Sequence, residues 1–209
     1  MKHAKKMKRD LHASGMWRPW LGLLTLISAL GLTAPAADDA ILSAKGTNGS
    51  HDFEVTFTQN ASGSYHALSK NFGYRTDFTI TENASGTYHV LGKTLGLFAA
   101  TGHRTDLTVS KNASGTYLIK GTNSGYQTDL KVSMDGAGNY RAEGLNLSYK
   151  NNLTISGSRS FRIEGENGSH RTNITASSGR ADRPGVDMKD PLPFQVLLAL
   201  SVFVGSKPG

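Results

Sequence analysis

The sequence contains no cysteine among its 209 residues, so its stability has to come from packing and backbone hydrogen bonds without disulfide bonds. It also lacks a long apolar run. The apolar runs at residues 21–32 and 194–204 fall well short of the roughly 20 residues that a membrane-spanning helix needs. A 3.6-residue periodicity is missing between residues 51 and 179, which argues against helices in that region.

Signatures of catalysis are absent as well. The sequence has no nucleophile elbow, no phosphate-binding loop and no zinc signature. Its prominent serines and aspartates recur in an internal repeat, whereas catalysis needs a few unlike groups that converge at one place. We therefore expect no enzyme activity, and the sequence assigns no catalytic residue, no cofactor-binding residue and no metal ligand.

The excess of positive charge is confined to one end of the chain. The sequence has 23 basic and 16 acidic residues and a net charge of +7. Six of the basic residues and one acidic residue lie in positions 1–37, which leaves 17 and 15 and a net charge of +2 in the remainder. Because the two signs are interspersed there, nucleic acid is not an expected partner.

Residues 1–37 have the features of a bacterial secretory signal peptide. A basic start is followed by the apolar run at 21–32 and then by the small-x-small sequence Ala34-Pro35-Ala36. We predict Sec-type export, cleavage beside Ala36 or Ala37, and a secreted or cell-surface location. The expected organisation is a signal peptide over 1–37, a β-repeat domain over 38–180, and a proline-containing linker with an apolar tail over 181–209. No transmembrane helix is expected in the mature chain.

Six copies of one repeat occupy residues 51–179. Five copies have an acidic or amide position, a short alternating run, a turn cluster such as Asn-Ala-Ser-Gly, and a second alternating run, and the sixth ends after its first run. Both runs have a period of two, as in strands with one buried and one exposed face. The aligned positions are Asp52, Asp77, Asp106, Asp129, Asn152 and Asn173, at intervals of 25, 29, 23, 23 and 21 residues.

The repeat predicts an all-β fold with two strands in each copy. Such units stack as a solenoid, in which equivalent residues form ladders, or continue as an antiparallel meander that curls into a barrel. The close match of the turn and tyrosine positions favours a β-solenoid of about five to six strand–turn–strand units. The barrel is the alternative. It requires the two runs of one copy to pair with each other as a hairpin.

The fourth copy, residues 128–142, resembles the curlin repeat family, the subunits of bacterial curli fibres. It contains the sequence Gly136-Ala137-Gly138-Asn139 and an inward-facing Ala142, and the export signal and the lack of cysteine also fit. The resemblance covers roughly residues 50–180 and implies self-assembly into cross-β fibres of a biofilm matrix. It implies no catalytic residue, because that family has none.

Histidines raise the question of metal binding. His66 and His89 share the outward position of the second run and would lie close together in a stack. No copy has two histidines at ligand spacing, so solvated histidines are the preferred interpretation. The histidines considered are His51, His66, His89, His103 and His170.

Two further repeated features have a functional and a structural interpretation. The Arg-Thr-Asp sequences at 75–77 and 104–106 suit a charged stripe for a polysaccharide, but turn capping by Thr and Asp and cross-strand pairing by Arg are favoured. Repeated aromatic residues suit stacking on sugars, but their parity with Ala, Val and Ile favours core packing. These residues are Tyr65, Tyr88, Tyr117, Tyr140 and Phe161.

Asn-x-Ser/Thr sequences are also frequent, and we interpret them as turn formers rather than glycosylation sites. The apolar tail from Phe194 to Val204 is expected to cap the last repeat, with docking on a secretion or nucleation partner and attachment to the cell surface as the alternatives. The asparagines concerned are Asn48, Asn60, Asn83, Asn112, Asn146, Asn152, Asn167 and Asn173.

The leading functional hypothesis is an exported, curlin-like structural protein that self-assembles into an amyloid fibre or biofilm matrix. It rests on unpaired strand edges at the two ends of a solenoid, together with low net charge and high β content. The alternative is a monomeric secreted β domain of adhesin type that binds a glycan, a small ligand or a host surface.

Overall fold

The computed structural model describes residues 40–95, 102–179 and 192–204, all within one compact unit of the chain. The predicted signal peptide and most of the predicted linker lie outside the described residues. The described residues form twelve strands followed by one helix. The strands are β1 (Ala40–Asn48), β2 (His51–Gln59), β3 (Tyr65–Asn71), β4 (Tyr74–Glu82), β5 (Tyr88–Leu95), β6 (His103–Lys111), β7 (Tyr117–Asn123), β8 (Tyr126–Met134), β9 (Tyr140–Asn146), β10 (Tyr149–Gly157), β11 (Ser160–Asn167) and β12 (His170–Ser178), and the helix is α1 (Phe194–Phe203).

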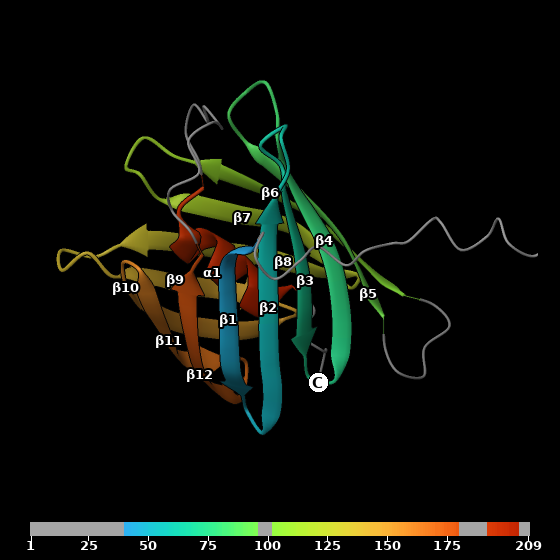
Figure 1. The fold of residues 1–209 in the computed structure, drawn as a ribbon, viewed down its shortest axis with the longest axis vertical. Coiled ribbons are helices and arrows are strands. Elements are labelled where there is room, and N and C mark those ends of the chain that lie inside the picture. The colour runs from blue at the N-terminus through green and yellow to red at the C-terminus, as the bar shows by residue number, and fades with distance from the viewer. Residues whose placement is uncertain (1–39, 96–101, 180–191, 205–209) are drawn as a thin grey trace, which may run out of the picture. The chain divides into compact units, whose positions relative to one another are not determined.

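The twelve strands form a closed antiparallel barrel in which each strand pairs with its neighbours in the chain, and β1 pairs with β12 to close the ring (Figure 1). The two runs of one repeat pair with each other, as β4 does with β5, from Arg75 opposite Leu95 to Glu82 opposite Tyr88. The all-β prediction is therefore confirmed in its barrel alternative, and the solenoid prediction is wrong. The chain forms a barrel because the turns within a repeat and the turns between repeats are both tight enough to reverse its direction, so consecutive strands pair as hairpins.

The alternation of side chains places the core inside the barrel. Along β8, for example, Leu130 and Val132 are fully buried, whereas Asp129 and Lys131 between them are exposed. The pairing also corrects the alignment of the first copy. Lys45 lies opposite Glu54, as Lys120 lies opposite Asp129, so Glu54 rather than Asp52 occupies the equivalent position.

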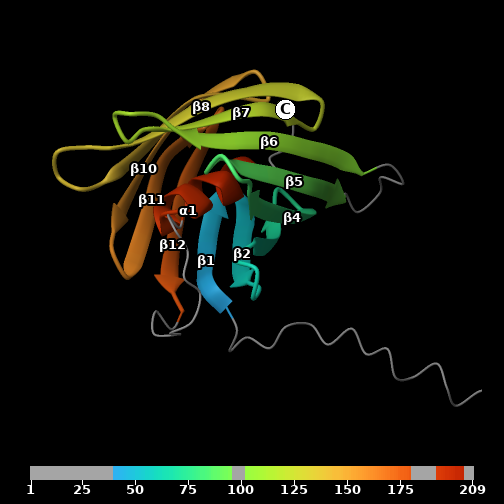
Figure 2. The same ribbon diagram turned by 90° about the horizontal axis from the view of Figure 1, so that it is seen from above.

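Helix α1 fills the interior of the barrel (Figure 2). A barrel of about eight strands is filled by side chains alone, whereas much wider barrels leave an open lumen. Twelve strands therefore need an additional core element. Every residue from Val196 to Val204 is buried, and the apolar side chains of α1 join the hydrophobic core of the strands. The prediction that the tail caps a last repeat is wrong, because a closed barrel has no terminal repeat to cap.

A layer of buried polar side chains receives the C-terminal end of α1. Asn123 and Asn146 donate hydrogen bonds to the carbonyl oxygen of Phe203, and Asn71 and Asn167 donate to that of Val202. These donors suit the end of a helix, where the last carbonyl groups have no partner within the helix. The polar layer has one residue from each strand except β2: Asn48, Asn71, Thr76, Thr94, Thr105, Asn123, Thr128, Asn146, Asn151, Asn167 and Thr172.

At the opposite end of the barrel, four hairpin turns share one hydrogen-bond pattern. In the turn after β4, the Oδ1 atom of Asn83 accepts hydrogen bonds from the backbone N–H groups of Ser85 and Thr87. The same contacts are made by Asn60, Asn112 and Asp135. The turn interpretation of the Asn-Ala-Ser sequences is thus confirmed for Asn60, Asn83 and Asn112. It is wrong for Asn48, Asn146 and Asn167, which belong to the polar layer, and for Asn152 and Asn173, which lie within strands on the outer face.

Candidate functional site

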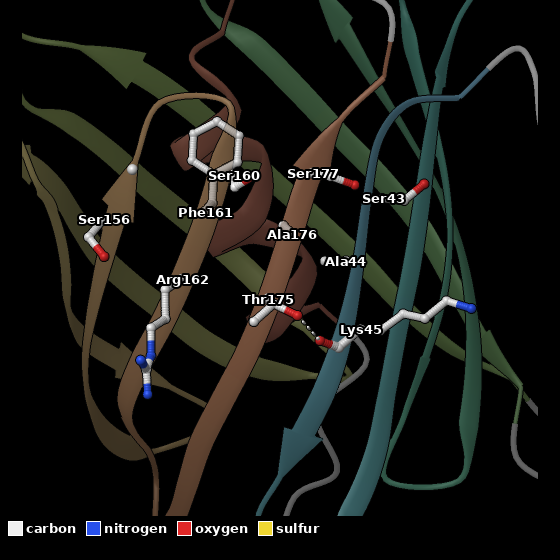
Figure 3. A pocket seen from close by; sticks show the side chains of 11 residues that line it. Ser43, Ala44, Lys45, Ser156, Ser160, Phe161, Arg162, Thr175, Ala176 and Ser177 are labelled. Atoms are coloured by element: carbon white, nitrogen blue, oxygen red, sulfur yellow. Dashed lines mark hydrogen bonds between the residues drawn. The ribbon is translucent and has the colours of Figure 1, made fainter.

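A shallow groove of about 610 Å³ crosses the outer wall of the barrel over β10, β11, β12 and β1 (Figure 3). Its floor includes buried residues such as Ala44, Phe161 and Ala176, and most of the outward side chains around it are short. Hydroxyl groups from four strands surround this floor. They belong to Ser43, Ser156, Ser160, Thr175 and Ser177.

Two cationic side chains, Lys45 and Arg162, extend from the same wall. Each has a carboxylate partner, because Lys45 contacts Glu54 at 2.9 Å and Arg162 contacts Glu164 at 2.8 Å. Such exposed pairs contribute little to stability. The groove therefore offers hydroxyl groups and two partly neutralised cations, a combination that suits a polyhydroxyl ligand more than a strongly anionic one.

The predicted histidine candidates do not come together as a metal site. The Nε2 atom of His66 lies 2.7 Å from Oδ1 of Asp77, and that of His89 lies 2.8 Å from Oδ1 of Asp106. His66 and His89 are on β3 and β5, with β4 between them, so the close approach expected from a stack is wrong. Within the described ranges, no group of three His, Asp or Glu residues is placed to hold a metal ion.

The Arg-Thr-Asp sequences are divided between the two faces of the wall. Thr76 and Thr105 point inward into the polar layer, and their aspartates pair with histidines on neighbouring strands. The expectation that Thr and Asp cap turns is therefore wrong. The expectation of cross-strand pairing by Arg is wrong too. Arg104 lies 4.0 Å from Asp106 on its own strand, and within the described part of the chain Arg75 has no ion pair.

The repeated aromatic residues belong to the core, as the sequence predicted. Tyr65, Tyr88, Tyr117 and Phe161 are at most 6% exposed, and Tyr140 is partly buried against the same cluster. Burial raises the pKa of Tyr65 to about 12, although a hydrogen bond with the backbone of Leu192 lowers it. That contact ties the segment before α1 to the wall.

A second set of aromatic residues was missed. The first residue of each even-numbered strand has an aromatic ring, and all six lie at the end of the barrel that holds the polar layer. The sequence does contain a pattern that marks them. Five of the six stand two residues before a Thr or Asn of the polar layer, and His51 stands two residues before Phe53. We call this set the aromatic rim. It consists of His51, Tyr74, His103, Tyr126, Tyr149 and His170.

The rim residues pack around the circumference of the barrel end. Phe72, in the turn after β3, packs between His51 and His170 with its ring tilted against theirs and with centroid distances of 5.2 and 4.8 Å. The rim also covers the polar layer, because Tyr126 lies opposite Asn123 and Tyr149 opposite Asn146. These two tyrosines are still 44% and 40% exposed.

No helix of the described residues is long and apolar enough to cross a membrane. Comparison with known proteins finds no matching family model, no matching curated protein and no matching solved structure.

Proposed function

We propose that this chain is an exported binding module of adhesin type, which acts as a single closed barrel and holds a polyhydroxyl ligand such as a glycan in the outer-wall groove. The observation that carries the proposal is the groove itself, with five hydroxyl side chains and two cations around a floor of buried residues. Neutral sugars are bound through hydrogen bonds from such groups, and a shallow groove accommodates an extended chain. Export rests on the signal-peptide pattern of residues 1–37.

Closure of the barrel supports a single-chain module over a fibre subunit. The fibre hypothesis depended on unpaired strand edges, and the hydrogen-bonded partners of β1 are β2 and β12 of the same chain. A closed barrel leaves no edge strand as a template for another chain. Fibre assembly would therefore require the barrel to open between two strands and lose the pairing of that seam.

Binding is tested with the full chain and three soluble probes, chito-oligosaccharides, cello-oligosaccharides and dextran. Calorimetry should detect binding of at least one of them. Ser160→Trp places a large ring on the groove wall and should weaken that binding by roughly tenfold or more, which corresponds to about 1.4 kcal/mol. Ser133→Trp is the matched control, because Ser133 faces outward on β8, away from the groove.

Two outcomes would contradict the proposal. One is the absence of binding to all three probes, and the other is an equal effect of Ser160→Trp and Ser133→Trp. Thioflavin fluorescence and fibre diffraction of the same preparation test the single-chain state. Growth of fibres with cross-β diffraction from the folded chain would contradict it and would favour the curlin-like hypothesis.

A further inference from the structure

A patch of four cations crosses strands β3 to β6, the green part of the barrel in Figure 1. Lys70 lies directly opposite Arg75, and Lys93 lies directly opposite Arg104. All four side chains are exposed on the outer face. Like charges at directly opposite positions destabilise a sheet, so this arrangement is unfavourable for the barrel on its own. We call these four residues the cationic patch.

The carboxylates nearest to the patch are occupied by other partners. Glu54, opposite Lys70, makes its ion pair with Lys45. Asp77, opposite Lys93, contacts His66. Among the described residues, Lys70, Arg75 and Lys93 take part in no ion pair, and Arg104 reaches only Asp106, at 4.0 Å.

The cations on β7 and β9 differ in this respect. Lys120 lies 3.6 Å from Asp129, and Arg141 lies 3.3 Å from Glu143. Lys131 and Lys150 also lack an ion pair among the described residues, so what sets the patch apart is that its cations lie directly opposite one another. An uncompensated patch retained against its own repulsion points to an anionic ligand.

Two aromatic residues stand at the barrel end where the patch begins. Tyr74 and His103, both of the aromatic rim, directly precede Arg75 and Arg104, and because consecutive residues of a strand point to opposite faces, their rings lie over the barrel end rather than on the wall beside the cations. Rim residues stand on alternate strands, about 10 Å apart by strand spacing, which is close to the length of a disaccharide unit. The stem of Lys93 lies against Gly102, where an added Cβ would be 2.9 Å from the Cγ atom of the lysine.

We propose that the cationic patch and the adjoining rim residues Tyr74 and His103 form a binding site for an acidic polysaccharide, with sulfate or carboxylate groups on the cations and sugar rings on the aromatic faces. Arginine suits such anions because its planar guanidinium group binds them with two hydrogen bonds. The site is separate from the groove, since β2 lies between its strands and β1. Failure of either proposal therefore leaves the other intact.

The test measures affinity of the full chain for heparin, alginate and neutral dextran at two salt concentrations. Every variant contains the same basic residues before position 38, so their contribution cancels. The double variants Lys70→Gln/Arg75→Gln and Lys93→Gln/Arg104→Gln should each weaken binding to heparin or alginate by about tenfold. The matched control Lys120→Gln/Arg141→Gln removes equal charge from paired cations and should change the affinity less than twofold.

Stability provides a second readout. Because each patch variant removes a like-charge contact, its urea midpoint should stay the same or rise, so that lost binding cannot be attributed to unfolding. Tyr74→Ala should weaken binding further than Tyr126→Ala, which removes a rim residue away from the patch.

Equal losses in the patch and control variants would overturn the proposal, as would the absence of binding to both acidic polysaccharides. Two competitors are included: single-stranded DNA, and vesicles that contain phosphatidylglycerol. If either one binds more tightly through the same four cations, the patch recognises that anion and the polysaccharide assignment is wrong.

Discussion

The side-chain amide of Asn123 donates a hydrogen bond of 2.9 Å to the carbonyl oxygen of Phe203, 80 residues further along the chain. The same amide group donates to Asn146 at 3.3 Å, and its oxygen accepts from Thr105 at 2.8 Å. A single inward side chain thus joins three strands to the end of the internal helix. Because the apolar faces of α1 offer no directional contact, these hydrogen bonds fix how far the helix enters the barrel.

Replacing Asn123 with alanine should destabilise the fold by about 2–3 kcal/mol, because the hydroxyl of Thr105 and the amide of Asn146 lose a buried partner. Urea unfolding followed by circular dichroism measures this change. Asn173→Ala is the control, since Asn173 is exposed on the outer face of β12, and it should stay within about 0.5 kcal/mol. A similar cost for both variants would show that the polar layer does not anchor the helix.

The helix should behave as core of the barrel. Leu198 is fully buried, so Leu198→Ala should cost about 2–5 kcal/mol through lost contacts and an internal cavity. Leu198→Asp would place a charge among apolar side chains and should expel the helix, which binding of a hydrophobic dye would report. Gln195→Ala, at the partly exposed start of α1, should leave both measurements nearly unchanged.

Much of the barrel wall could be predicted from the sequence. The alternation of residues such as Leu130 and Lys131 predicts strands and their buried faces, and the Asn-Ala-Ser-Gly sequences predict turns between them. The sequence could not decide between a solenoid and a barrel in the same way. Both satisfy the same alternation, and the repeat of Tyr88 and Tyr117 looks alike whether the rings stack in a ladder or line a closed interior.

The internal helix could not be derived from the repeat. Of the eleven residues from Phe194 to Val204 only Gln195 and Ser201 are polar, so the segment has no polar face from which a helical periodicity could be recognised. Its position follows from the width of a twelve-stranded barrel, which only the closure of β1 on β12 reveals. The cationic patch was hidden for a related reason, since opposite partners such as Lys93 and Arg104 depend on register rather than on sequence distance.

A repeat position on β3 offers a test of buried polarity. Equivalent inward positions hold glycine in the other odd-numbered strands, such as Gly121 of β7, where an added Cβ would collide with the carbonyl oxygen of Asp106. β3 has Ser69 there, and among the described residues its buried hydroxyl stands out by having no hydrogen-bond partner. Ser69→Ala should therefore stabilise the fold by about 1 kcal/mol, whereas Gly121→Ala should destabilise it. Loss of stability in Ser69→Ala would reveal a partner for the hydroxyl, such as a buried water.

The turn after β8 should depend on pH in a way that its three relatives do not. The backbone N–H of Asn139 holds the pKa of Asp135 below its ordinary value, with smaller help from the Asn139 side chain and Ala137. A lowered folded-state pKa means that the contribution to stability is present above the unfolded value near 4 and is lost as the pH falls through the folded value. Carboxyl chemical shifts should show a lower midpoint for Asp135 in the protein than in a peptide of residues 133–141. Asp135→Asn keeps the acceptor oxygen of the other turns and should remove this pH dependence.

Alkaline unfolding should report on Tyr65. Its folded-state pKa of about 12 lies above the ordinary value of 10 because burial disfavours the phenolate. Because this pKa is raised on folding, the stabilising contribution of the protonated Tyr65 is complete below pH 10 and is lost as the pH rises through 12. The loss amounts to about 2–3 kcal/mol across that window. Urea midpoints measured at pH 8, 10 and 11 should therefore decline.

Tyr65→Phe separates the hydrogen bond from the ionisation. The variant should lose about 1 kcal/mol at neutral pH, because the hydroxyl no longer contacts the backbone of Leu192. Its urea midpoint should fall less steeply above pH 10, because phenylalanine has no hydroxyl group that could ionise in the unfolded state. An alkaline slope equal to that of the unmodified chain would show that ionisation of Tyr65 does not govern stability there, and the wall would then have to open at other residues first.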